Sequence, residues 1–406
     1  MKKTFILLTG VWFAMTAMLN AQNTLTVNHT TPDGMAAEIT AALGGAETTT
    51  IATLVIAGDA FVTFEDCRAI RMAFPTADLK TLDLSQAKFQ NDSLPGTPPG
   101  VSIGAFNPLA DGNGLAVTEV KLPTNLRVVG DRIFRKFKFL TNIVLPSSVI
   151  RIGQASFNAC EQLKYIKFPD GLKTIDSYAF YQCYRLGLDA LNPMDELPEG
   201  LVGDLGNLCF SQTSVNFEYI PVGITRIGSS AFKYNGSPST VVRSLASLII
   251  YQNIAEIGAT AFQGQMYLNN IEINRMTPPT TGANAFDGIG EGSLQAVDLY
   301  IPIGTEEAYN IEPWNLMVRQ ALLPPITGLS RVENADIRVY PNPTVDKINV
   351  SLKIEDVKSA KILNLTGSVV RNLPVVNNLS FDVSDLAKGV YFIQLNNDIF
   401  IKFAKN

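Results

Sequence analysis

The sequence predicts an α/β solenoid whose repeats stack their strands into one parallel sheet on a concave face. A small α/β cap precedes this solenoid, and an all-β immunoglobulin-like sandwich follows it. Three observations in the 406-residue chain lead to this prediction. A phenylalanine recurs every 22 to 30 residues, residues 22–79 do not repeat, and residues 337–406 alternate strands with turn signals. We assign residues 80–323 to the solenoid and residues 324–336 to a linker.

The recurring phenylalanine closes each repeat. A degenerate first copy, "IGAF", lies at residues 103–106. A unit this short cannot bury its own hydrophobic face, so neighbouring units must stack on one another. The seven full positions are Phe134, Phe157, Phe180, Phe210, Phe232, Phe262 and Phe286.

Each repeat begins with a predicted strand. In "LTNIVLP" the apolar residues Leu140, Ile143 and Leu145 lie before a proline slot, and the last two alternate with an exposed residue. Proline then removes a donor from the strand ladder and ends the strand. The prolines of this slot are Pro123, Pro146, Pro169 and Pro221.

A turn and a short return complete the repeat. The turn reads "IG" or a variant, and because Asp176 is the one substitute for glycine, we predict a positive φ at this slot. In the return, Phe157, Cys160 and Leu163 are spaced by three. This spacing predicts one turn of helix with three apolar side chains on one face.

Two of the four cysteines share that inward slot. Cys160 and Cys183 stand where Phe137 stands in the preceding unit, which favours buried thiols that act as small hydrophobes. A disulfide between the stacked neighbours is the alternative after export. Zinc would need further ligands, and Cys67 and Cys209 do not share the slot.

The first 79 residues divide into two predicted parts. Residues 1–21 have two lysines, an apolar run and a small residue at Ala21, which is typical of a cleaved secretory signal. In residues 22–79, "DGMAAEITAALGG" predicts a helix with Asp33 as N-cap and Gly44 as stop. "IATLVIAG" predicts a strand and "FVTFEDCRAIRMAF" a second helix. We expect this region to cover the open edge of the first repeat.

The pattern "LxxIxLPxxLxxIGxxAFxxC" resembles the BspA-type leucine-rich repeat of bacterial surface proteins, over about residues 79–323. The resemblance implies a non-catalytic adhesin that binds host matrix proteins or other bacteria. Between Leu186 and Pro221 the chain departs from the pattern, because acidic residues stand in strand slots. We therefore expect the sheet to be bulged or interrupted there.

Residues 337–406 carry a second resemblance. "VYPNP" at residues 339–343, "LxGxVV" at 365–370 and "KGVYFIQL" at 388–395 precede a terminal "IKF" with a lysine tail. In this order they resemble the C-terminal sorting domain of the type IX secretion system of Bacteroidetes. The resemblance implies export, handling by that machinery, and a final place at the cell surface or outside the cell. With the signal removed, no other stretch is long and apolar enough to span a membrane.

Composition excludes several functions. A formal net charge of −5 gives no basic footprint for nucleic acid. His29 is the only histidine, so most metal and acid–base constellations are ruled out. GxSxG, Walker and HExxH motifs are absent. We therefore predict no enzyme, no metal and no cofactor.

We predict a partner-binding site on the outward side of the strands in the middle repeats, where apolar and aromatic residues concentrate. Alternatively, side chains of the irregular loop at residues 189–206 cover this row. Two other functions stay open: a structural scaffold of the cell envelope and a glycan-binding accessory protein. The predicted site residues are Tyr165, Lys167, Phe217, Tyr219, Ile249 and Glu272.

Overall fold

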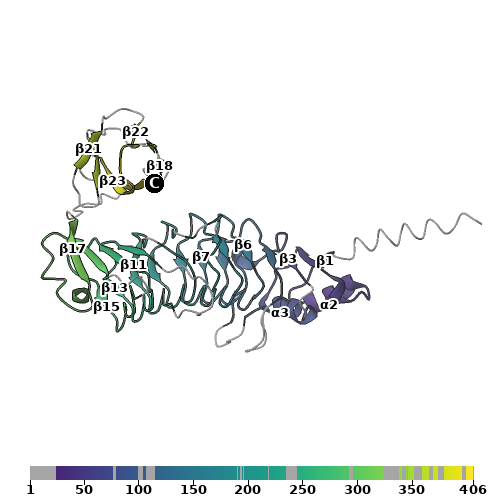
Figure 1. Ribbon diagram of the computed structural model, residues 1–406. Helices are drawn as coiled ribbons and strands as arrows, with labels where there is room; N and C mark the ends of the chain where they lie inside the picture. The colour runs from purple at the N-terminus through teal and green to yellow at the C-terminus, as the bar shows by residue number, and fades with distance from the viewer. Residues whose placement is uncertain are drawn as a thin grey trace, which may run out of the picture. The chain divides into compact units, whose positions relative to one another are not determined.

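A computed structural model shows two compact units, Met1–Asn270 with Pro279–Val297, and Ile271–Pro278 with Asp298–Asn406 (Figure 1). The predicted signal at residues 1–21 and the linker at residues 324–336 lie outside the described residues. The structure describes residues 24–75, 79–98, 104–106, 115–189, 191–192, 194, 196–217, 219–234, 245–291, 296–323, 338–340, 344, 346–351, 359–364, 369–373, 379–395 and 399–405.

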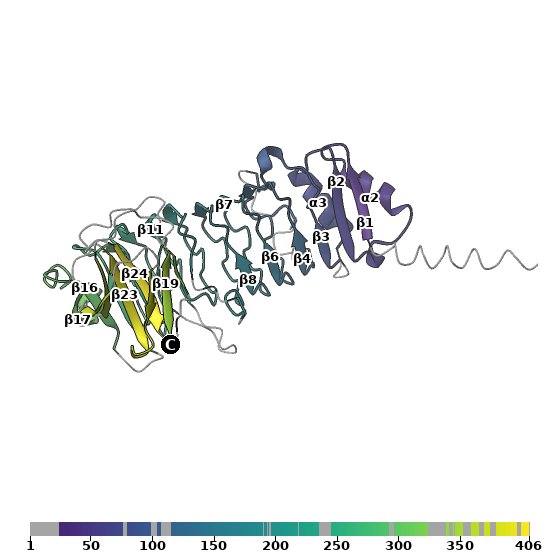
Figure 2. The same cartoon turned by 90° about the horizontal axis from the view of Figure 1, so that it is seen from above.

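The predicted strands are present as the first strands of the coils. In the first unit they pair in parallel, and β6 and β8 align Asn142 with Tyr165. Figure 2 shows β3, β4, β6 and β8 of this row lying side by side. In the first unit the row comprises β3 (Thr81–Asp83), β4 (Glu119–Lys121), β6 (Asn142–Val144), β8 (Tyr165–Lys167) and β12 (Ser247–Ile250). The second unit contains β16 (Asp298–Pro302), β17 (Val318–Leu323) and most of β14 (Asn270–Ile273).

Each coil also carries a second short strand, which the sequence analysis placed in a turn. These strands form two further parallel sheets, with orders β5-β7-β9 and β10-β11-β13-β15. Most of them are only two residues long with a single inward residue, so they have too little alternation to be recognised. They are β5 (Val128–Val129), β7 (Arg151–Ile152), β9 (Thr174–Ile175), β10 (Gly203–Leu205), β11 (Ile224–Ile227), β13 (Glu256–Ile257) and β15 (Thr280–Thr281).

The glycine slot after each second strand is required by close packing, and the predicted positive φ is wrong. None of the slot glycines at 130, 153, 206, 228 and 258 has a positive φ. A Cβ on Gly258 would lie 2.4 Å from the backbone nitrogen of Ser229 in the preceding coil. Glycine is therefore needed because successive coils touch backbone to backbone at this slot.

The return of each coil is a run of turns, so the predicted helical turn is wrong. Ala155 and Ala159 have φ values of 52° and 59°, which no α-helix contains. Bonds between coils, such as Phe157 N to Ala179 O at 2.9 Å, alternate with bonds inside the coil, such as Cys160 N to Phe157 O at 3.1 Å. The predicted inward spacing is confirmed, because Phe157, Cys160 and Leu163 are fully buried.

A ladder of phenylalanine rings runs through the core of the first unit. The rings of Phe157 and Phe180 are nearly parallel, with centroids 5.3 Å apart and an interplanar angle of 2°. The same stacking continues from Phe180 to Phe210 and from Phe232 to Phe262, each at 5.3 Å. The repeating phenylalanine in the sequence thus corresponds to one continuous buried stack.

The N-terminal region adds two helices and two longer strands. Strands β1 (Thr24–His29) and β2 (Thr53–Gly58) precede β3 and β4 in one parallel sheet, with order β1-β2-β3-β4. The helices are α2 (Met35–Leu43) and α3 (Phe64–Ala73), with short 3-10 turns at Thr48–Thr50 and Gln90–Asp92. Both predicted helices and the predicted strand are present, whereas β1 was not predicted.

The caps of the two helices differ from the prediction at one point. The N-cap of α2 is Gly34, so the prediction of Asp33 is wrong, while Gly44 ends the helix in the left-handed conformation as predicted. Asp33 instead accepts a hydrogen bond from the Thr63 hydroxyl at 2.5 Å. Thr63 caps α3 in a capping box with Asp66. Asp33 thus ties the start of α2 to the start of α3.

The second unit contains two antiparallel sheets, with orders β18-β19-β22 and β21-β20-β23-β24. One hydrophobic cluster is shared by both sheets, including Ile348, Phe381, Ile393 and Phe403. Trp314, on a 3-10 turn at Trp314–Leu316, is also buried. The strands are β18 (Arg338–Tyr340), β19 (Lys347–Ser351), β20 (Ala360–Asn364), β21 (Val369–Leu373), β22 (Leu379–Asp382), β23 (Gly389–Leu395) and β24 (Ile399–Lys405).

Candidate functional site

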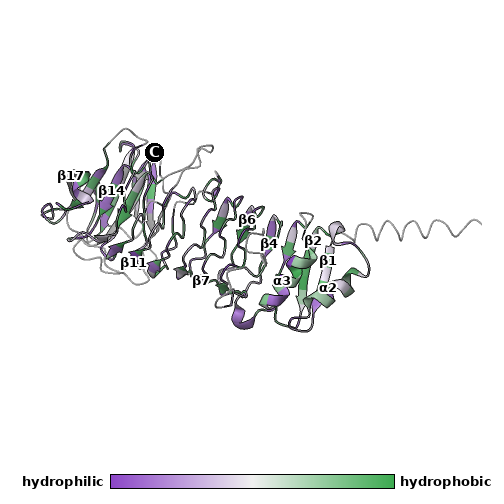
Figure 3. Cartoon of the chain, turned by 90° about the horizontal axis from the view of Figure 1, so that it is seen from below, coloured by the Kyte–Doolittle hydropathy of each residue, from purple (hydrophilic) through white to green (hydrophobic). Residues whose placement is uncertain are grey.

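Two of the six predicted site residues lie on an exposed sheet face. Lys167 of β8 is exposed and Tyr165 is half-buried. Beside them on β6, Asn142 is exposed and the side chain of Val144 is 72% exposed. We call the outward side of these strands and of β4, which presents Glu119 and Lys121, the β4–β6–β8 face. In Figure 3 β4 is largely hydrophilic, whereas β6 carries hydrophobic colour.

The exposed placement of Phe217 and Ile249 is wrong. Phe217 is fully buried and meets the rings of Phe210 and Phe232 edge to face, with centroids 5.0 and 6.3 Å away. Ile249 is only 8% exposed. Phe217 lies in a stretch that forms no regular strand among the described residues, only the isolated bridge from Tyr219 to Ile249, so alternation does not decide its direction. Ile249 lies in the regular strand β12, but there the three consecutive residues 248–250 are all buried, so alternation does not predict its exposure either.

Tyr219 is half-buried beneath the loop that follows the third full repeat. Burial raises the pKa of Tyr219 well above its usual range, and the charges of Glu199 and Glu196 and a hydrogen bond with Glu199 raise it further. The backbone of Asn216 also donates to Met194 O at 3.2 Å. The alternative that residues 189–206 cover part of the row therefore holds for Tyr219. The expected interruption of the first-strand sheet is also found here.

Glu272 lies in the second unit, on β14, and is half-buried. Its carboxylate accepts a hydrogen bond from Asn274 Nδ2 at 2.8 Å. Within the same unit, burial raises the pKa of Tyr300, and the charges of Asp298 and Glu272 raise it further. Glu272 is thus part of a local polar group around Tyr300.

Charged residues at one end of the β4–β6–β8 face interact with β3. The Lys121 ammonium lies 3.7 Å from the Asp83 carboxylate, and the Thr81 hydroxyl donates to Glu119 at 3.2 Å. Exposed ion pairs of this kind contribute about 0–1 kcal/mol to stability. The face therefore presents charges of both signs on one side of an apolar centre at Val144.

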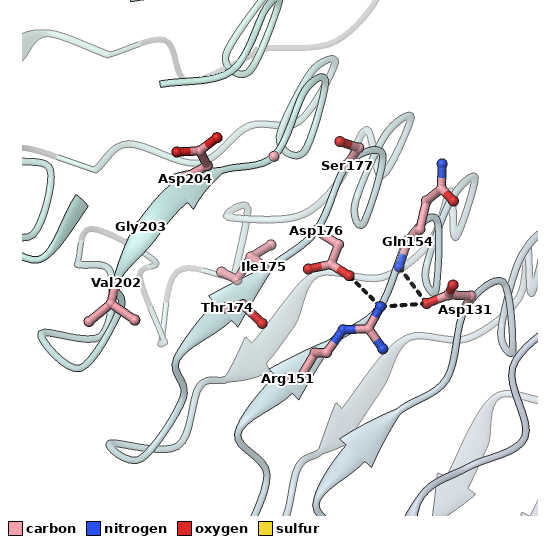
Figure 4. A pocket seen from close by; sticks show the side chains of 11 residues that line it. Asp131, Arg151, Gln154, Thr174, Ile175, Asp176, Ser177, Val202, Gly203 and Asp204 are labelled. Atoms are coloured by element: carbon pink, nitrogen blue, oxygen red, sulfur yellow. Dashed lines mark hydrogen bonds and ion pairs between the residues drawn. The ribbon is translucent and has the colours of Figure 1, made fainter. Parts of the chain in front are cut away.

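A groove of about 530 Å³ opens on the sheets of the second strands. Arg151 of β7 lines it, and its Nη2 donates to Asp131 Oδ1 at 2.9 Å and to Asp176 Oδ2 at 2.5 Å (Figure 4). Asp131 Oδ1 also accepts from the backbone nitrogen of Gln154 at 3.0 Å. Thr174, Asp176, Ser177, Val202 and Asp204 complete most of the wall.

Burial shapes the electrostatics of this groove. Burial raises the pKa of Asp176, an effect that the positive charge of Arg151 and its hydrogen bond oppose. Burial lowers the pKa of Arg151, but the two carboxylates outweigh it, so the pKa is raised overall. Arg151 therefore stays charged between Asp131 and Asp176. In the sequence, Asp176 stands out only as an exception in the glycine slot, and no pattern marks Asp131 or Arg151.

The four cysteines are free and buried. Cys160 Sγ donates to Phe134 O at 3.2 Å, and Cys183 Sγ donates to Phe157 O at 3.0 Å. Burial raises the pKa of Cys160 well above its usual range, so its thiol is held in the neutral form. Across the described ranges, no group of three or more histidine, cysteine or acidic side chains is placed to hold a metal ion.

The fold defines the class of the protein: a solenoid of parallel strands, followed by two antiparallel sheets. Residues 113–238 and 239–305 match the BspA type leucine-rich repeat region in six copies, and residues 338–405 match the secretion system C-terminal sorting domain. The chain is a BspA-type leucine-rich repeat protein that ends in a C-terminal sorting domain for type IX secretion. It is exported and is either attached to the cell surface or extracellular.

Solved structures and curated proteins add little to this identification. The chain is similar to a leucine-rich repeat protein from Bacteroides ovatus solved by crystallography, with 21% identity and a TM-score of 0.34. The similarity covers 67% of this chain and 82% of that chain. No curated protein matches the chain. Of the helices in the described part of the chain, none is long and apolar enough to cross a membrane.

Proposed function

We propose that this protein is a non-catalytic, adhesin-like surface protein that binds a partner protein through the β4–β6–β8 face. The observation that carries the proposal is Val144, whose side chain is 72% exposed in the middle strand of three. Isolated exposed apolar residues are ordinary on protein surfaces. Here, however, a half-buried tyrosine from β8 lies in the neighbouring strand of the same face, which is an arrangement that protein interfaces favour.

The backbone beneath this face favours recognition at low entropic cost. Ile143 and Ile166, the central residues of β6 and β8, are buried and aligned in parallel register. Because a paired, buried strand fixes the direction of its side chains, little ordering remains to be done when a partner binds. Lys121 and Lys167 at the edges would set orientation and association rate more than affinity.

The resemblance to BspA-type surface proteins supports a partner among host matrix proteins or the surfaces of other bacteria. A structural scaffold of the cell envelope is the second candidate, and it would use the same face without a soluble ligand. In either case we propose that residues 22–79 cap the solenoid and that the strand row forms its concave face. We also propose that residues 337–406 form an immunoglobulin-like sandwich, which the type IX secretion machinery handles.

The test of the partner face compares two variants of the full exported chain. Purified protein is presented to immobilised host matrix proteins and to bacterial surface extracts, and bound partners are identified and titrated. In the variant Val144→Asp with Tyr165→Ala, we expect affinity to fall at least tenfold with an unchanged melting temperature. The control is Phe139→Ala, which removes a ring that is 50% exposed but lies in a turn of the return. Equal binding by both variants would remove the partner site from this face.

A second experiment tests the role of the C-terminal domain. Deleting residues 337–406 should leave the leucine-rich repeats folded and retain the protein in the periplasm, because the sorting domain is the part that type IX secretion reads. Cell fractionation and protease accessibility on whole cells measure this. Surface exposure of the truncated protein would contradict the assignment. We also expect the mature surface form to lack this domain.

A further inference from the structure

The groove beside Arg151 belongs to the sheets of the second strands, and the proposed partner face does not use it. We propose that this groove binds adjacent hydroxyl groups of a neutral glycan. The groove combines a break in the repeat pattern, unused hydrogen-bonding atoms and a negative formal charge.

The groove lies where the solenoid departs from its own packing rule. The slot that holds glycine in other coils holds Asp176 here. The next coil places Gly206 directly against it, since a Cβ on Gly206 would lie 2.3 Å from the Asp176 carbonyl carbon. A side chain at this slot gains nothing from the packing of the coils, yet here a carboxylate is held in place by Arg151. Its placement is therefore better explained by what it presents to the groove.

The ion pairs leave both donors and acceptors facing the groove. A single nitrogen of Arg151, Nη2, makes both bonds to carboxylates among the described contacts, as Figure 4 shows. A guanidinium has five N–H groups, so Nη1 and Nε can still donate. Asp176 uses Oδ2 and Asp131 uses Oδ1 in the same contacts, which leaves one oxygen of each carboxylate able to accept.

A pair of neighbouring hydroxyl groups matches this edge. Each hydroxyl can accept from the guanidinium and donate to a carboxylate at the same time, whereas an ammonium has no acceptor. The three carboxylates and one guanidinium of the wall have a formal charge of −2, which disfavours anionic ligands. Val202, 47% exposed, offers apolar surface for the C–H groups of a sugar ring. Because the ion pairs fix the polar atoms in advance, binding orders few side chains.

A cationic peptide side chain is the competing ligand for a groove of this charge. The geometry favours the glycan, because an incoming cation would face the unused N–H groups of Arg151. Asp204 is also shared with Arg226, whose Nη1 lies 3.5 Å away, so its charge is partly balanced. The experiment therefore includes both ligand classes.

The decisive variant is Asp176→Gly, which restores the residue that the repeat itself uses at this slot. Neutral oligosaccharides built from glucose, galactose and mannose are immobilised and probed with the full exported chain, with nona-arginine and sulfated oligosaccharides as further probes. The control is Glu256→Gln, on a second strand outside the groove, where Glu256 forms an exposed ion pair with Arg226 at 3.0 Å.

We expect at least one neutral oligosaccharide to bind, and Asp176→Gly to weaken that binding at least tenfold, while Glu256→Gln changes it less than twofold. The melting temperature of Asp176→Gly establishes that the variant is folded. Should it fail to fold, Asp204→Asn replaces it, because the Asp204 side chain is largely exposed and its change should not disturb folding. We expect Asp204→Asn to weaken binding of the neutral oligosaccharide at least threefold. Binding of nona-arginine or sulfated sugars alone, no binding at all, or neutral-sugar binding unchanged in the folded variants would each overturn the proposal.

Discussion

Gly228→Ala tests directly whether the glycine slot exists for close packing. Gly228 is buried after β11, and its backbone nitrogen donates to Leu205 O of the preceding coil at 2.9 Å. A Cβ at this position would meet three backbone atoms of residues 205–207, each 2.6 Å away. Real Cβ atoms do not approach so closely, so the coils must separate locally. Overpacking of this kind typically costs about 1–3 kcal/mol.

Gly171→Ala is the matched control, because it makes the same chemical change in open surroundings. Its added Cβ would meet only Ser147 O, at 3.6 Å, and its φ is not positive. A compatible glycine-to-alanine change stabilises by about 0.4–1 kcal/mol through the unfolded chain. Urea unfolding of the full exported chain, followed by circular dichroism, should therefore separate the two variants by about 1.4–4 kcal/mol. Equal midpoints would refute the packing explanation.

Three further predictions follow from the core and the helix junction. Phe180→Ala should lower the free energy of unfolding by about 3–5 kcal/mol, because the ring is fully buried in the stack. In the same urea titration the control Phe139→Ala, which removes an exposed ring, should lower it by less than about 0.5 kcal/mol. Cys160 and Cys183 should resist alkylation until the protein unfolds, and reductant should not change the melting temperature; a drop of many degrees would reveal a disulfide. Glu38, in the first turn of α2, accepts hydrogen bonds from the backbone nitrogen and the hydroxyl of Thr30 at 2.8 and 2.9 Å. Burial raises the pKa of Glu38, but these hydrogen bonds and the interaction with His29 outweigh it, so the pKa is lowered. The ionised Glu38 carboxylate therefore stabilises the folded protein at neutral pH, and this stabilisation is lost as the pH falls through the lowered pKa. The melting temperature of Glu38→Gln should accordingly lie below that of the unmodified protein at pH 6, and the difference should shrink towards pH 3. A constant difference would contradict this.

The first strands of the coils were predictable because each carries the full signal of a strand. In "LTNIVLP" the buried Ile143 alternates with exposed neighbours, and a proline marks the end. The second strands carry no such signal. Arg151–Ile152 is two residues long, and its pairing depends on the position of the neighbouring coil, which only the stacked structure supplies. The return was misread because a spacing of three is shared by a helix and by successive turns that point the same side chains inward.

The exposure of the proposed partner-site residues was predicted only in part, for the same physical reason. Tyr165 and Lys167 lie in a regular strand, so alternation correctly placed Lys167 outward and left Tyr165 partly exposed. Phe217 lies where the strand row is interrupted, and packing against Phe210 and Phe232 decided its direction. Ile249 lies in the regular strand β12 but is buried, as are both of its neighbours in that strand. The groove was not predicted at all, because Asp131, Arg151 and Asp176 are brought together by stacking three coils. Their one sequence signal was an aspartate in a glycine slot.

That aspartate shows how a repeat protein can gain chemistry without losing its architecture. At a slot where the backbones of neighbouring coils touch, glycine is the residue that packing requires, so a charged residue there imposes a cost of desolvation. Burial accordingly raises the pKa of Asp176, and the like charge of Asp131 raises it further, whereas Arg151 of the preceding coil opposes both through its charge and its hydrogen bond. The same three residues would be separated in any single coil. We therefore take a charged residue in a glycine slot as a sign of a binding site when a residue of an adjacent coil compensates its charge. Without such a partner, the same residue would indicate only a weakened repeat.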